Sequence, residues 1–162
     1  MTAERIMDWS GHRWLAFGAR LYLAVIFGMA AAYKILHPGS FALDVATYGI
    51  LPLSLINGFA LVVPWVEAVV GVMLLAGFRV RAAALLVSGM MVMFMVALAV
   101  ALAQGLDMSC GCFASAETGD ADPIGWTTMV RDTAWLALAV YVLLADRRPL
   151  GLDGLWSARR KT

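Results

Sequence analysis

The chain has 162 residues, of which 62% are hydrophobic and 14% are charged, and its formal net charge at pH 7 is +1. A soluble domain has about 45–50% apolar and about 25% charged residues, and so short a chain has too little interior to hide this excess. The composition therefore excludes an ordinary soluble domain, and the near-zero net charge argues against a nucleic-acid partner. We predict one domain, residues 1–162, embedded in a lipid bilayer.

A helix that crosses a bilayer needs about 20 mostly apolar residues. Four stretches of the chain meet this requirement, at residues 14–33, 55–78, 82–104 and 126–145. Lipid offers the backbone no hydrogen-bond partners, so each stretch must form a helix that satisfies its own peptide groups. The predicted fold class is an all-α integral membrane protein, a bundle of four transmembrane helices. Small residues on the first two helices predict close contacts between helices: Ala24, Gly28 and Ala32 on the first, and Ala68, Gly71 and Ala76 on the second.

Basic side chains gather on one side of this predicted bundle. The positive-inside rule places segments rich in Lys and Arg in the cytoplasm. It therefore predicts that both termini are cytoplasmic, and that the 34–54 and 105–125 loops lie on the outer side of the membrane. The basic residues assigned to the cytoplasmic side are Arg5, Arg13, Arg79, Arg81, Arg147, Arg148, Arg159, Arg160 and Lys161.

The 105–125 loop carries both cysteines of the chain, within Met108-Ser109-Cys110-Gly111-Cys112-Phe113. A disulfide stabilises a protein mainly by closing a long loop, and a bridge from Cys110 to Cys112 would close almost none. Its ring would be small and strained, and strained exposed disulfides exchange readily. We therefore expect redox-active thiols. Two alternatives stay open: a soft-metal site that adds the Met108 thioether to two thiolates, and a pair without redox function.

Four charged residues at or inside the predicted helices are candidates for a functional role. A nearby cation lowers the pKa of a thiol, so Lys34 and Arg131, which flank the outer loops, are candidate thiolate stabilisers. Ionisable groups inside a membrane span are costly and face a partner or a functional cavity. Arg20 and Glu67 lie at depths about one or two helical turns apart, which predicts a structural ion pair or, alternatively, contacts to a proton or to the polar groups of a bound quinone.

Taken together, these residues resemble the MauE and DoxX-like family of redox-associated membrane proteins over about residues 14–145. The resemblance implies a four-helix inner-membrane protein linked to periplasmic thiol chemistry, to maturation of a disulfide-rich protein and to a thioredoxin-like partner. Ala114 stands where the family usually has Gly, and Asp132 where it often has Asn. The motifs that carry the resemblance are Arg20, Gly28, Lys34 and Pro38, then Pro64-Trp65 with Glu67 and Gly71, then Ser109-Cys110-Gly111-Cys112-Phe113, and Arg131-Asp132.

The predicted function is thiol–disulfide oxidoreduction. Cys110 and Cys112 would exchange with a thioredoxin-like partner or a protein being matured, and electrons would pass to or from a membrane quinone. One alternative is a non-enzymatic anchor or assembly subunit of a redox complex, because nearly all of the chain lies in the predicted membrane. Another is copper handling, because methionines on the third predicted helix add thioethers to the loop thiols, although methionine is more often apolar filler.

Overall fold

The computed structural model describes residues 12–106 and 125–146. Within these ranges the helices are α2 (His12–Leu36), α3 (Pro38–Thr47), α4 (Leu53–Ala76), α5 (Val80–Ala103) and α6 (Trp126–Ala145), and there is no strand. Four of these helices, α2, α4, α5 and α6, are long and apolar enough to cross a membrane. The predicted fold class is confirmed: the chain is an all-α, multi-pass membrane protein.

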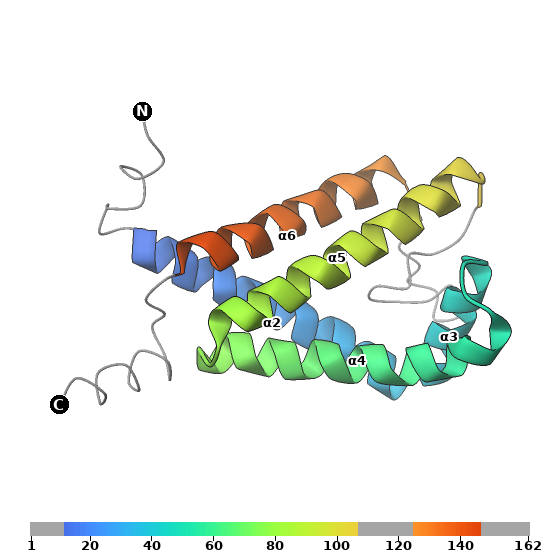
Figure 1. The fold of residues 1–162 in the computed structure, drawn as a ribbon, viewed down its shortest axis with the longest axis horizontal. Coiled ribbons are helices and arrows are strands. Elements are labelled where there is room, and N and C mark those ends of the chain that lie inside the picture. Colours follow the sequence, from blue (N-terminus) through green and yellow to red (C-terminus); the bar gives the residue numbers. More distant parts are fainter. Residues whose placement is uncertain (1–11, 107–124, 147–162) are drawn as a thin grey trace.

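The four long helices lie side by side, and the short helix α3 sits at one end of them (Figure 1). The packing is most extensive between α2 and α4 and between α5 and α6. The end of α5 and the start of α6 lie at the same end of the bundle as α3, and we call this the α3 end. The start of α2, the α4–α5 turn and the end of α6 lie at the opposite end.

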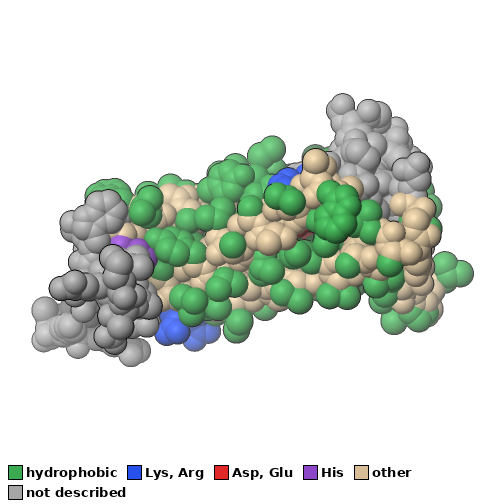
Figure 2. Space-filling view, turned by 90° about the horizontal axis from the view of Figure 1, so that it is seen from above, with side chains coloured by type: hydrophobic (Ala, Val, Ile, Leu, Met, Phe, Trp, Pro, Cys, Tyr) green, Lys and Arg blue, Asp and Glu red, His purple; other side chains and the backbone are tan. Residues whose placement is uncertain are grey.

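The outward surface of the long helices is hydrophobic. Leu61, Val72 and Leu85 are each more than half exposed, whereas the core residues Leu23 and Leu74 are completely buried. Figure 2 shows hydrophobic side chains along the whole length of the described bundle. A continuous apolar surface of this size is unfavourable in water and suits a lipid environment.

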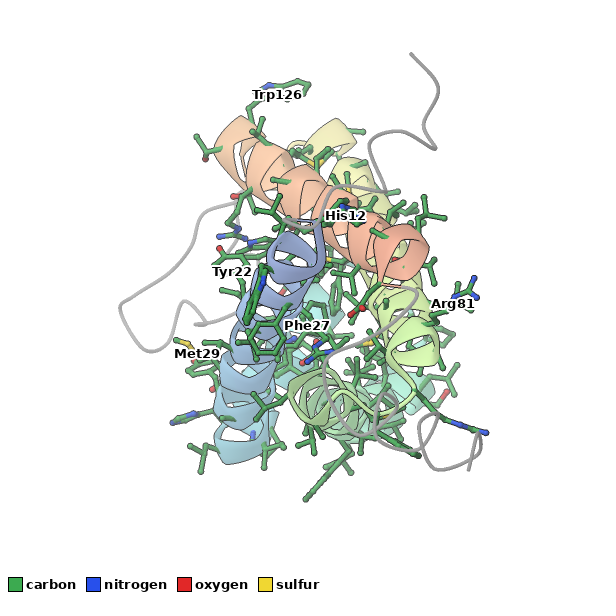
Figure 3. The ribbon with its side chains drawn as sticks, turned by 90° about the vertical axis from the view of Figure 1, so that its left-hand side faces the viewer. His12, Tyr22, Phe27, Met29, Arg81 and Trp126 are labelled. Carbon is green, nitrogen blue, oxygen red and sulfur yellow. The ribbon has the colours of Figure 1, made fainter. Side chains whose placement is uncertain are left out.

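The two ends of the bundle carry the residues typical of a membrane boundary. Trp126 is 81% exposed and projects from the start of α6, while Arg81 projects from the opposite end (Figure 3). The α4–α5 turn that presents Arg81 is tight, with Gly77 and Arg79 both in the left-handed region, at φ 67° and 46°. Aromatic side chains favour the interface between lipid and water, and Arg side chains favour the aqueous side.

Small residues bring α2 and α4 together, as predicted. A Cβ atom placed on Gly71 would lie 3.4 Å from the carbonyl oxygen of Ala24 and 3.5 Å from the amide nitrogen of Gly28. The helix backbones are therefore almost in contact at this level, which is the usual effect of small residues in membrane bundles. Ala32 is exposed, so the close contact does not extend to the end of α2.

The segment between the first two spans is more ordered than the predicted 34–54 loop. The first helix continues to Leu36, and α3 begins directly afterwards with Pro38 in its first turn, where a missing amide hydrogen costs nothing. Phe41 and Val45 lie one turn apart and are buried in a second hydrophobic cluster. Their partners in this cluster are Ile56, Ala60 and Val63 of α4, so α3 is held against α4 as a cap.

Candidate functional site

A buried ion pair joins α2 to α4 near the α3 end. The ammonium group of Lys34 donates a hydrogen bond to Oε1 of Glu67 over 2.6 Å. Both side chains are 2% exposed. Because an isolated charge is costly in a low-dielectric interior, the two groups stabilise each other only as a pair.

Aromatic rings enclose the cation of this pair. The rings of Phe41, from α3, and Phe94, from α5, each lie with their centroid 5.0 Å from Nζ of Lys34. This distance is in the range of cation–π attraction. Oε2 of Glu67 has no hydrogen-bond partner among the described residues, and a cavity of about 20 Å³ adjoins it, with Trp135 in its wall. A cavity of this size holds at most one water molecule.

The predicted pairing of Arg20 with Glu67 is wrong. Arg20 is 1% exposed, and its guanidinium lies 3.5 Å from Oδ2 of Asp146, the residue that caps α6 at the end opposite α3. Glu67 is instead paired with Lys34. Depth along a helix does not fix which way a side chain points, and Asp146 was counted outside the fourth predicted span. Arg20 and Glu67 therefore have separate partners.

Arg131 forms a second polar group near the α3 end. Its Nε donates to the adjacent carboxylate of Asp132 over 3.1 Å, and its guanidinium lies 4.7 Å from the ring centroid of Trp135. Trp135 in turn donates a hydrogen bond to the hydroxyl of Tyr22 on α2, over 3.2 Å. The Arg131 side chain is 29% exposed, whereas that of Asp132 is almost completely buried. Of the two predicted cations, Arg131 is the one that reaches the surface.

A cavity of about 300 Å³ lies between α3, the α3–α4 connection and α5. Its wall is mostly apolar, but Asp44 and Tyr48 contribute polar groups. Burial raises the pKa of Tyr48 from its ordinary value of 10.0 to about 12, and the negative charges of Asp44 and Asp132 add to this effect. Sequence reasoning missed both residues because Asp44 lies on, and Tyr48 directly follows, a helix too short to be recognised as a membrane segment.

The predicted redox residues Cys110 and Cys112 lie outside the described residues, as does Met108. The segment that contains them joins α5 to α6, and both of these helix ends lie at the α3 end (Figure 1). Lys34, Arg131 and the 300 Å³ cavity belong to the same end of the bundle. Among the described residues, no three His, Cys, Asp or Glu side chains come together in a way that could hold a metal ion.

Comparison with known proteins gives a consistent result. The family model described as methylamine utilisation protein MauE matches residues 12–145. Proteins named methylamine utilization protein MauE from Paracoccus denitrificans and Methylorubrum extorquens are 32% and 34% identical to the chain over 124 and 125 residues. Each alignment covers 76% of this chain and 65% of the relative, so the chain spans about two thirds of their length.

The protein of the same name from Methylophilus methylotrophus is 28% identical over 142 residues, with 87% of this chain and 72% of the relative covered. No solved structure matches the chain. The family model covers all five described helices together with the segment that carries the two cysteines. The chain belongs to the MauE family.

Proposed function

We propose that this chain is a membrane-embedded thiol–disulfide exchange protein of a methylamine-utilisation system. Cys110 and Cys112 are its working thiols. The observation that carries the proposal is their arrangement: they are the two cysteines of the whole chain, and one glycine separates them. A pair so close in sequence gains almost nothing as a structural crosslink, whereas a strained disulfide exchanges readily.

The exchange reaction balances between two dithiol–disulfide couples. A thiolate of the pair attacks a disulfide of the partner, a mixed disulfide forms, and the partner releases a thiolate. The second cysteine then attacks the mixed disulfide, so that the pair becomes oxidised and the partner is fully reduced. The reverse sequence oxidises the partner. We expect the partner to be a thioredoxin-like protein, or a protein being matured, on the periplasmic side of the inner membrane.

Arg131 is the cation that we assign to thiolate stabilisation. It lies at the start of α6, which directly follows the cysteine-bearing segment, and 29% of its side chain is exposed. Arg131 donates a hydrogen bond to Asp132 but still reaches the surface, whereas Lys34 is 2% exposed, paired with Glu67 at 2.6 Å and enclosed by aromatic rings. Lys34 and Glu67 therefore hold α2, α3 and α4 together, and neither needs to contact a thiol.

The two cysteines can be tested by trapping. Cys112→Ser and Cys110→Ser proteins, each in intact membranes, are expected to differ: the one that keeps the attacking thiol accumulates a mixed disulfide, which reducing agent dissolves. Ser109→Ala is the matched control, since it alters the same segment and leaves both thiols. Normal complex assembly and function with both cysteines replaced by Ser would favour the anchor interpretation. Stoichiometric copper that is lost on this replacement would favour metal handling.

The role of Arg131 has a separate readout. Arg131→Met is expected to raise the pKa of the attacking thiol, because the neighbouring positive charge that favours the thiolate is removed. The measurement is the rate of alkylation of a single-cysteine protein as a function of pH. Arg81→Met, at the opposite end of the bundle, is the control and should leave the profile unchanged. An Arg131→Met profile identical to that of the control would contradict this assignment.

A further inference from the structure

The 300 Å³ cavity has the composition of a site for a flat, largely apolar ligand. Three phenylalanine rings line it, from Phe41 on α3, Phe59 on α4 and Phe94 on α5. Asp44 and Tyr48 provide polar groups from the α3 side. Binding pockets for small molecules are typically apolar cavities of about 300–1,000 Å³ with a few polar groups that fix orientation. The volume here is at the lower limit of that range.

Tyr48 restricts the chemistry of the ligand. The Tyr48 hydroxyl is protonated at neutral pH and can donate a hydrogen bond as well as accept one. A ligand with an acceptor such as a carbonyl oxygen can use this donor. A lipid acyl chain fits the apolar walls but has no group that could accept this hydrogen bond.

The position of the cavity favours entry from the bilayer. Val96 and Ile50 line the cavity, yet they are 58% and 48% exposed on the lipid-facing surface. The lining residues of α5 lie six to ten positions before its end at Ala103, which is roughly 9–15 Å along the helix. The cavity is thus within the apolar layer, close to the end of α5 from which the cysteine-bearing segment leaves.

We propose that this cavity binds the ring of a membrane quinone, with a quinone carbonyl accepting a hydrogen bond from Tyr48 and the isoprenoid tail leaving past Val96 into lipid. The redox role of the site rests on the proposed thiol function. Two thiols lose two protons and two electrons as a sulfur–sulfur bond forms. The quinone takes up the two protons and the two electrons, and its two carbonyls become the hydroxyls of a quinol. The quinone is then the oxidant that restores the disulfide after each exchange in which the pair has oxidised the partner.

Binding can be tested independently of the thiols. A Cys110→Ser/Cys112→Ser protein in detergent is labelled with a photoreactive azido derivative of decylubiquinone, and modified peptides are mapped by mass spectrometry. We expect labelling within residues 44–51 or 93–97, which excess decylubiquinone or a short-chain menaquinone suppresses and oleate does not. Labelling that neither quinone suppresses, or that oleate suppresses equally, would overturn the proposal in favour of a lipid site.

Two variants sharpen the test. Ala97 lines the cavity, so Ala97→Phe should fill it and abolish the quinone-suppressible labelling, whereas Ala99→Phe, exposed to lipid on the same helix, should not. Tyr48→Phe keeps the shape and removes one hydrogen bond, which should weaken binding roughly fivefold. Equal affinity in Ala97→Phe and Ala99→Phe would refute the location, and unchanged affinity in Tyr48→Phe would refute the carbonyl contact.

The same assay separates this inference from the proposed function. If quinone binds the cysteine-free protein but is never reduced by the thiols of the parent protein, the redox coupling is refuted and the binding site stands. Mixed disulfides with a partner, without any quinone binding, would refute the cavity proposal and leave the exchange function intact.

Discussion

Removal of one member of the Lys34–Glu67 pair should destabilise the bundle strongly. At 2.6 Å and an effective dielectric constant of about 20, two unit charges attract each other by roughly 6 kcal/mol. Desolvation of the two ions costs several kcal/mol each, so the intact pair is near balance. Lys34→Met or Glu67→Leu leaves a buried, uncompensated charge, and each should lower the free energy of unfolding by about 3–5 kcal/mol.

The double variant Lys34→Met/Glu67→Leu distinguishes this explanation from simple loss of packing. With both charges gone, it should be as stable as the parent or more stable by about 1–4 kcal/mol, so that the single effects are far from additive. The assay is reversible unfolding in mixed micelles of increasing dodecyl sulfate fraction, followed by circular dichroism. Leu75→Met, exposed to lipid on α4, is the control. Additive single effects, or single effects below about 0.5 kcal/mol, the usual range of surface substitutions, would refute the reasoning.

Three further predictions concern other parts of the bundle. Arg20→Met should lower the free energy of unfolding by about 3–5 kcal/mol in the same assay, because it breaks the buried ion pair with Asp146. The exposed Arg81→Met should change it by less than about 0.5 kcal/mol. Equal effects of the two substitutions would contradict the Arg20–Asp146 pair. Gly71→Ala should be tolerated, whereas Gly71→Leu should cost about 1–3 kcal/mol by forcing helix backbones apart, with Gly89→Leu, which meets open space, as a neutral control. Tyr48 should ionise near pH 12, as measured by ultraviolet difference spectroscopy against Tyr48→Phe. Its raised pKa favours the protonated folded state, so its contribution to stability is complete below pH 10 and is lost as the pH rises towards 12. Ionisation near pH 10 would contradict the burial of Tyr48.

The long helices were predictable because lipid imposes a simple rule. A span of about 20 apolar residues must be helical, and each of the four predicted ranges overlaps one long helix of the structure. The short helix α3 gives no such signal, since ten residues with apolar contacts at Phe41 and Val45 are also compatible with a loop. Its stability depends on packing against α4, which the local sequence does not reveal.

The charge pairs were less predictable because they depend on rotation and on tertiary neighbours. Ionisable residues within spans were correctly expected to find partners, but the partner of Arg20 proved to be Asp146 and that of Lys34 proved to be Glu67. Lys34 was predicted as a candidate thiolate stabiliser, yet its ammonium group is enclosed by Phe41 and Phe94. Aromatic rings from α3 and α5 cannot be placed around a cation by counting depth along α2.

The redox state of Cys110 and Cys112 in intact membranes tests the central claim most directly. Membranes are equilibrated in dithiol redox buffers of graded potential, quenched with acid, and treated with a membrane-impermeant alkylating reagent before the mass of the protein is measured. Our account predicts two populations, with no label or with two, whose ratio follows the buffer potential because the two thiols form one reversible couple. Two permanently free thiols across all potentials, or an intermediate in which either thiol is labelled independently of the other, would contradict it.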